Sequence, residues 1–416
     1  MTSLNSGVIA VRLFISLFIQ RLLAQIVGEV GIARIGDLRN LMAILMSVTT
    51  LGVFNGIIKY VSEFKDNSVE LKKVFSTVFV FISIASIITA LVLFFGASFF
   101  SELIFGSTYF EFLFKVLSIV IPCIALQRVF NGILNGLSDY KKFVKIELYG
   151  YLLASGLLVY CLYNYNLDGV LIAIAVTPFI QLGILLYVFG SVLKKYLRFK
   201  DISIKIPYAK QLLAFTLMSF VSTILLNYIE IDVRNMIASK ISESDSGYWT
   251  AMTNISKNYM VFTASIFTLY VIPKFSSITL RKDFKVEVLH IYKTLLPFFC
   301  VGMILIYVFR DYVIKILYPN FIGMEPLFRW QLLGDFVRIS SLVIAHQFLA
   351  KKMIYSFVFS ELLSLALFYI LSKYLIIEYG IEGIVMAHFI RYVIYFVVVL
   401  FLVWYYFKEH KTLLKS

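Results

Sequence analysis

Long apolar runs dominate the chain and are separated by short polar segments. Each run is near or above the roughly 20 residues that an α-helix needs to cross the hydrocarbon core of a bilayer. The runs are too long and alternate too weakly for barrel strands, and open strand edges are not viable in hydrocarbon. The pattern predicts an all-α integral membrane protein with twelve transmembrane helices, over residues 7–28, 37–62, 73–97, 110–134, 145–163, 169–193, 211–238, 247–274, 288–309, 325–349, 354–375 and 382–407.

Lysine and arginine are unevenly shared between alternate connections. Connections on one predicted side hold 21 of these residues, and those on the other side hold 4. Cytoplasmic connections of membrane proteins are enriched in Lys and Arg, so the first set is expected to be cytoplasmic, together with both termini. This set comprises residues 63–73, 135–145, 194–210, 274–285, 350–353 and 408–416, and the other set comprises 29–36, 98–109, 164–168, 239–246, 310–323 and 376–381.

An internal repeat divides the chain into halves. Residues 164–171 (NYNLDGVL) resemble residues 378–385 (EYGIEGIV), 214 positions later. The longest cytoplasmic connection separates six helices from six, so the halves share one orientation and are expected to be parallel repeats. We therefore expect two six-helix lobes around a central cationic cavity. The expected boundaries are 1–193 for the N-lobe, 194–210 for the linker, 211–407 for the C-lobe and 408–416 for a cytoplasmic tail.

Composition excludes several classes of protein. Hydrophobic residues make up 61% of the chain and charged residues only 15%, which excludes a soluble enzyme. The net charge of +14 is explained by the cytoplasmic connections, so nucleic-acid binding is not needed to account for it. Cys123, Cys161 and Cys300 lie in apolar runs without CxxC spacing and are interpreted as packing residues. We found no catalytic constellation or metal-ligand spacing, so we expect neither enzymatic activity nor a cofactor.

Polar residues inside the predicted helices are the candidates for a substrate-binding cavity. Inserting a basic residue at the middle of a transmembrane helix costs about 2.5–3.5 kcal/mol. Most basic residues inside the predicted helices should therefore face a water-filled cavity or a partner. In the helix over 211–238, Thr216, Ser219, Thr223, Asn227, Glu230 and Arg234 recur every three or four residues and form one stripe. Arg12 and Arg21 are nine residues apart, so at most one of them faces the cavity. The candidate cavity residues are Arg21, Asn55, Arg128, Asn131, Asn227, Arg234, Lys257, Gln331, Arg338 and Arg391.

Two interpretations of these residues stay open. Glu230–Arg234 and Asp335–Arg338 are spaced as local ion pairs that would only stabilise the helix bundle. Arg128, Lys257 and Arg391 have no acid within four residues, which favours a role in the cavity. The cavity is then net positive, and the forked donors of Arg suit phosphate oxygens, whereas Asn and Gln suit sugar hydroxyls.

Three motifs give the chain a family resemblance. They are residues 51–61 (LGVFNGIIKYV), 263–273 (TASIFTLYVIP) and 330–336 (WQLLGDF). With them the chain resembles the polysaccharide-unit flippases of the multidrug/oligosaccharidyl-lipid/polysaccharide exporter superfamily, in particular lipid III and O-antigen flippases. The resemblance implies that an undecaprenyl-pyrophosphate-linked oligosaccharide is flipped across the bacterial inner membrane by alternating access. The resemblance implies cavity roles for Arg234, Arg310, Asp335 and Arg338. It also implies that relatives have a basic residue at the position of Arg21, in the first predicted helix.

Alternative functions and the source of energy for transport were also considered. An ion-coupled drug or metabolite antiporter of the same superfamily is the second candidate, although exporters of organic cations need acidic cavities. The short outer connections disfavour a glycosyl polymerase. Asp335, Glu230 and His388 can exchange protons cheaply, so they are the candidates for coupling to H⁺ or Na⁺, with Asp335 leading. Potential-driven flipping is the competing hypothesis. Other polysaccharide assembly proteins are possible partners.

Overall fold

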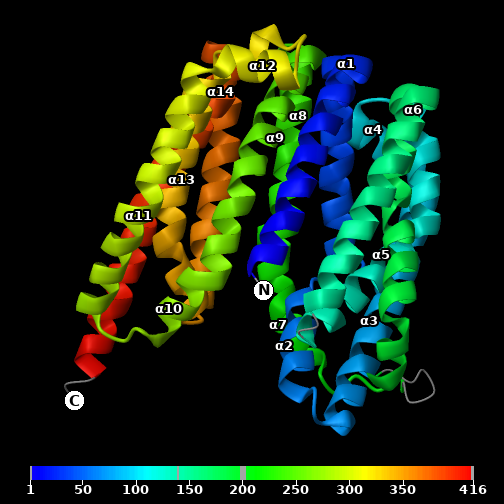
Figure 1. Ribbon diagram of the computed structural model, residues 1–416, viewed down its shortest axis with the longest axis vertical. Coiled ribbons are helices and arrows are strands. Elements are labelled where there is room, and N and C mark those ends of the chain that lie inside the picture. The colour runs from blue at the N-terminus through cyan, green and yellow to red at the C-terminus, as the bar shows by residue number, and fades with distance from the viewer. Residues whose placement is uncertain (1, 138–139, 197–202, 414–416) are drawn as a thin grey trace. The chain divides into compact units, whose positions relative to one another are not determined.

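Helices account for nearly all of the structure. The computed structural model describes residues 2–137, 140–196 and 203–413, and no strand occurs within them. The expectation of an all-helical protein is confirmed. The helices, most of them labelled in Figure 1, are α1 (Thr2–Val48), α2 (Phe54–Phe64), α3 (Ser68–Phe95), α4 (Ala97–Phe105), η1 (Thr108–Phe110), α5 (Glu111–Gly136), α6 (Tyr140–Tyr196), α7 (Ala209–Ser219), η3 (Phe220–Leu225), α8 (Leu226–Lys240), α9 (Glu243–Ile266), η4 (Phe267–Val271), α10 (Ile272–Ser277), α11 (Arg281–Val308), α12 (Arg310–Leu317), η5 (Ile322–Met324), α13 (Leu327–Ala350) and α14 (Ile354–Leu413).

Eight helices of the described chain are long and apolar enough to cross a bilayer. Two of these stretches, Lys142–Tyr196 and Ile354–Glu409, contain 55 and 56 residues. A straight helix of that length would measure about 80 Å, far more than the roughly 30 Å of a hydrocarbon core. Each contains one non-helical residue, Asn166 in α6 and Gly380 in α14. The chain is therefore a multi-pass membrane protein whose longest helices are divided by kinks.

The connections expected at residues 29–36, 164–168 and 376–381 are sharp kinks and not loops. Helical structure resumes directly after Gly28, Asn166 and Gly380, whose φ angles are 66°, 49° and 56°. Glycine and asparagine reach positive φ at the lowest steric cost. A single residue can therefore turn the chain where the polar pattern predicted a loop of several residues.

The repeat seen in the sequence has a counterpart in the backbone. Asn166 has φ 49° and ψ −133°, and Gly380, 214 residues later, has φ 56° and ψ −139°. Gly169 and Gly383 stand three residues after these kinks, and a Cβ at either would collide with a carbonyl oxygen of the preceding helix. Both positions thus require glycine for the same reason, the close approach of two backbone segments.

The helix expected over residues 37–62 is interrupted. α1 ends at Val48 and α2 begins at Phe54, and Leu51 and Gly52 between them have positive φ. The hydroxyl of Thr216 on α7 donates to the Leu51 carbonyl at 2.6 Å, and a Cβ on Gly52 would lie 2.7 Å from the Ser219 Cβ. α7 therefore packs directly against the interruption. The π-helical segment η3 follows α7, and such segments often mark functional positions.

Contacts group the helices into two units. The first contains the chain up to Val27 and Arg34–Asn235, and the second contains Gly28–Ala33 and the chain from Met236. The core of the first unit joins α2, α3, α5, α6 and α7, with Ile57, Val78 and Ile133 fully buried. In the second unit α13 packs against α11 and α14, which run beside it in Figure 1. The lobe boundary at 194–210 stays a prediction; residues 197–202 of that linker and 414–416 of the tail lie outside the described residues.

Candidate functional site

A buried carboxylate is the centre of a polar cluster in the second unit. Asp335 on α13 has no exposed surface. Its Oδ2 accepts hydrogen bonds from Ser256 Oγ at 2.6 Å, from the Tyr259 hydroxyl and from Gln331 Nε2 at 3.1 Å. Its Oδ1 faces His388 Nε2 at 3.0 Å. Four donors from α9, α13 and α14 therefore satisfy this carboxylate inside the helix bundle.

The orientation of His388 follows from its neighbours. One guanidinium nitrogen of Arg391 lies 3.1 Å from His388 Nδ1. Because arginine only donates hydrogen bonds, Nδ1 must accept, and the ring proton then sits on Nε2 and points to Asp335. His388 is thus a neutral imidazole between an anion and a cation. Protonation would place a second hydrogen on Nδ1, facing a group that has only donors.

Aromatic rings surround the two cations of this cluster. The guanidinium carbon of Arg391 lies 4.2 Å from the ring centroid of Phe368 and 4.5 Å from that of Tyr392. Arg338 lies 5.5 Å from the Tyr392 centroid. Ring faces attract cations without neutralising their charge, so the arginines keep their positive charge in a poorly solvated region. Such an arrangement suits a bound anion.

The first unit holds a second buried charge pair. Arg234 on α8 forms an ion pair with Asp37 on α1, and the two side chains are 2% and 3% exposed. Next to it, Asn40 Nδ2 donates to Glu230 Oε2 at 3.0 Å and reaches the Asn227 carbonyl at 3.4 Å. The polar stripe predicted on the helix over 211–238 therefore finds its partners on α1. These contacts stabilise the packing of α8 against α1.

The other predicted cavity residues of the first unit lie apart from this pair. Arg128 on α5 is stacked on the ring of Phe54, with 3.6 Å between the guanidinium carbon and the ring centroid. Asn131, one turn later, is buried. Asn55 on α2 is exposed, and Arg21 on α1 is half-buried.

Two predicted residues of the second unit are at least partly exposed, whereas Asp335 is fully buried. Lys257 on α9 is exposed. Arg310 begins α12, and its guanidinium pairs with Glu325 at 2.8 Å, 29% and 43% of the two side chains being exposed. The hydrogen bond to Glu325 raises the pKa of Arg310 above its ordinary value. The residue is thus in the connection between α11 and α13 and not within a long helix.

Sequence reasoning missed several members of both clusters. Asp37 is an acid in an apolar run, so the rule that singled out Asp335 could also have found it. Asn40 lies one turn further along the same helix. Ser256 and Tyr259 carry no comparable signal, because hydroxyl side chains are common in transmembrane helices. The aromatic ring of Tyr392 was also not recognisable as a cation partner among so many aromatic residues.

Comparison with known proteins places these features in a family. The chain is 28% identical over 393 residues to the lipid III flippase of Escherichia coli (strain K12), covering 93% of each, and equally similar to that of Shigella flexneri. Its fold is similar to that of the lipid II flippase MurJ in an inward closed conformation, with a TM-score of 0.75 and 16% identity over 96% of this chain and 87% of that one. An inward-facing MATE family multidrug transporter matches with a TM-score of 0.71 and 14% identity over 95% and 96%. Residues 38–321 match the family described as polysaccharide biosynthesis protein. That match spans more than half of the chain, which therefore belongs to this family.

Proposed function

We propose that the protein flips an undecaprenyl-pyrophosphate-linked oligosaccharide, of the O-antigen or lipid III type, from the cytoplasmic to the periplasmic leaflet of the bacterial inner membrane. The observation that carries this proposal is the similarity to lipid III flippases over 93% of both chains. The likeness of the fold to MurJ supports the same class of protein.

The proposed architecture has twelve transmembrane helices in two six-helix lobes, with both termini cytoplasmic. The kinks at Gly28, Asn166 and Gly380 support this number, because they divide three of the eight apolar stretches and so give eleven crossings, and the continuous helical run of α9, η4 and α10 would supply the twelfth. The distribution of Lys and Arg supports the orientation. The matching kinks 214 residues apart support parallel repeats. Cysteine labelling from each side of the membrane tests the orientation, and labelling of a cysteine at Glu243 only from the cytoplasm would contradict it.

Arg338 and Arg391 are the leading candidates for binding the pyrophosphate. Both present a guanidinium against aromatic faces, while Asp335 beside them is satisfied by four other donors. An incoming phosphate would therefore not have to compete with Asp335 for its established hydrogen bonds. Gln331 in the same cluster, and Asn131 and Asn227 in the first unit, are proposed for sugar hydroxyls. Arg21, Arg128, Arg234, Lys257, Arg310 and Asn55 remain members of the proposed cavity set.

Asp335, Glu230 and His388 are the proposed coupling residues, and among them His388 is proposed to couple proton movement to substrate release. Protonation turns Nδ1 from an acceptor into a donor and so disfavours its contact with Arg391. Asp335 stabilises the imidazolium from the other side. The remaining charged or titratable groups that face this region are Arg338, Glu361, Tyr259, Tyr392 and Tyr395. Proton binding would thus free Arg391 to change partners.

Transport in proteoliposomes tests the binding residues. With a fluorescent lipid-linked oligosaccharide, we expect Arg391→Ala to abolish flipping and Arg391→Lys to retain part of it, because Lys keeps the charge but loses the fork. Arg329→Ala is the matched control, since this exposed arginine of α13 lies over Trp330 and away from Asp335. Full transport by the double variant Arg338→Ala, Arg391→Ala would contradict the assignment.

Separately imposed gradients test the coupling. At fixed membrane potential, a pH gradient should change the flipping rate of the wild type but not of His388→Gln, which cannot be protonated. Collapsing pH and sodium gradients without any change in rate would exclude ion coupling and leave flipping driven by the potential, worth about 2.3 kcal/mol per charge per 100 mV.

A further inference from the structure

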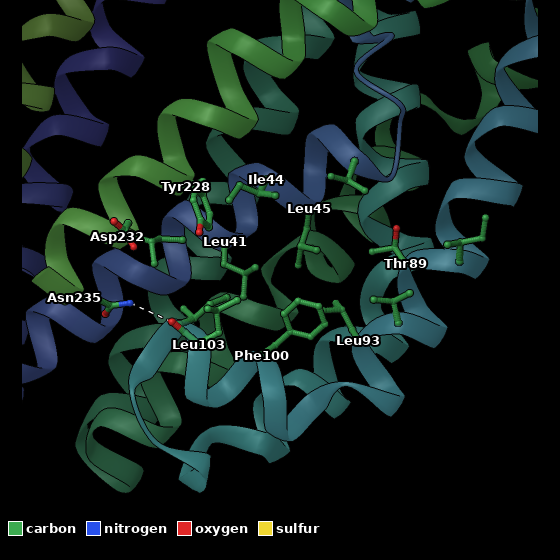
Figure 2. Close-up of a pocket in the computed structure, with 15 residues that line it drawn as sticks. Leu41, Ile44, Leu45, Thr89, Leu93, Phe100, Leu103, Tyr228, Asp232 and Asn235 are labelled. Carbon is green, nitrogen blue, oxygen red and sulfur yellow. Dashed lines mark hydrogen bonds between the residues drawn. The ribbon is translucent and has the colours of Figure 1, made fainter. Parts of the chain in front are cut away.

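An apolar pocket lies within the first unit. It is enclosed by α1, α3, α4 and α8 and has a volume of about 370 Å³ (Figure 2). The floor is buried, with Leu41, Leu45, Leu93, Ile104 and Ile231 each at most 6% exposed.

The rim of the pocket is open. It includes Ile88, Val92, Leu103 and Tyr228, which are 46–56% exposed. Apolar side chains exposed at this level favour hydrocarbon over water as their surroundings. An apolar chain that enters through the open rim would therefore remove this surface from water.

One end of the pocket is polar. Figure 2 shows Asp232, Asn235 and Tyr228 at this end, with Thr89 and Leu93 at the other. Asn235 Nδ2 donates to the Leu103 carbonyl at 3.1 Å and joins α8 to α4. Among the described residues, the structure gives Asp232 no hydrogen-bond or ion-pair partner. It lies eight residues before the end of α8, about 12 Å inside the helix.

A carboxylate at this depth needs a cationic or donor partner. Ionisable groups in transmembrane segments are costly and almost always paired. The neighbours of Asp232 in the pocket are apolar except for Asn235, Tyr228 and Thr89, none of which is cationic. A cationic group on the molecule that fills the pocket would supply this partner.

We propose that the pocket binds one acyl chain of an ethanolamine phospholipid from the bilayer and that the lipid's ammonium group pairs with Asp232. The apolar floor takes the chain, and the carboxylate takes the three N–H donors of the headgroup. The negative charge of Asp232 disfavours a lipid pyrophosphate at the same end, so the occupant differs from the proposed transport substrate. The inference depends only on the chain being a membrane protein.

The size of the pocket agrees with a single chain. Its lining on α1 extends from Leu41 to Val48, about 10 Å along the helix axis. Its volume is near the lower limit of pockets that bind small molecules, roughly 300–1,000 Å³. The pocket therefore holds a segment of one chain, and the rest of that chain and the second chain of the phospholipid would lie outside the rim.

Photo-crosslinking of the full-length protein in nanodiscs tests this proposal. Two probes with identical photoreactive acyl chains, phosphatidylethanolamine and phosphatidylglycerol, are compared, and labelled residues are identified by mass spectrometry. We expect labelling on Leu41–Val48 and Tyr228–Ile231, with about a fivefold preference for phosphatidylethanolamine, the size expected for one partly exposed ion pair. Asp232→Asn should keep the labelling but reduce the preference to about one, because it removes the charge with little change in shape.

A pocket-filling variant and its control complete the test. Leu45→Trp should abolish labelling by both probes, whereas Ile119→Trp, at a 75% exposed position of α5, should not. Competition by unlabelled phosphatidylethanolamine in the wild type gives the same information if Leu45→Trp does not fold. Equal labelling by both probes, no labelling of the pocket, or labelling only by a photoreactive isoprenyl pyrophosphate would overturn the proposal.

Discussion

Replacing Arg234 or Asp37 separates the structural role of this pair from a role in binding. The two side chains are 2% and 3% exposed and form an ion pair between α8 and α1. Removing one partner leaves the other charge buried without compensation, which typically costs about 3–5 kcal/mol. Replacing both by apolar residues of similar volume is often neutral. We therefore expect Arg234→Met and Asp37→Leu each to lower the free energy of unfolding by about 3–5 kcal/mol, and the double variant to recover to within about 1 kcal/mol of the wild type.

Reversible unfolding in mixed micelles measures these differences, with tryptophan fluorescence as the signal. The substrate-binding hypothesis for Arg234 is tested on the same proteins in the transport assay. A stable double variant that still flips would assign Arg234 to the fold, and a stable but inactive one would assign it to binding as well. Additive destabilisation in the double variant, or single effects below about 1 kcal/mol, would refute the ion-pair reasoning.

Three further predictions concern single positions. Gly52→Ala should lower the free energy of unfolding by about 1–2 kcal/mol, because φ is 68° and the new Cβ meets α7, whereas Gly302→Ala, with open space around it, should not destabilise the protein; equal melting temperatures of the two variants would contradict this. Tyr259→Phe removes a donor to the buried carboxylate of α13 and should cost about 1–3 kcal/mol in the same unfolding assay; an unchanged value would argue against the hydrogen bond. Arg310→Ala should leave the melting temperature unchanged, because its pair with Glu325 is partly exposed to solvent, and a large decrease would show that its contacts with Glu325 and Tyr307 stabilise the fold.

The candidate residues of the second unit show how much of the site could be predicted from the sequence. Gln331, Arg338 and Arg391 were predicted as cavity residues, and Asp335 and His388 as coupling candidates. The structure joins Gln331, Asp335, His388 and Arg391 in one hydrogen-bonded chain. Which donors satisfy Asp335 was not predictable, because Ser256 and Tyr259 come from a helix about 80 residues earlier in the chain.

The sequence by itself determined that this is an all-helical membrane protein, since hydrocarbon forces each span to satisfy its backbone hydrogen bonds locally and a long apolar run can do so only as a helix. It also determined that polar stripes exist, since a helical period follows from spacing alone. Only the tertiary structure decided that Arg234 pairs with Asp37 across 197 positions. It also decided that residues 29–36 continue a helix after a kink at Gly28. The partner of a buried charge is whichever group packing brings within reach, and packing joins segments that are remote in the chain.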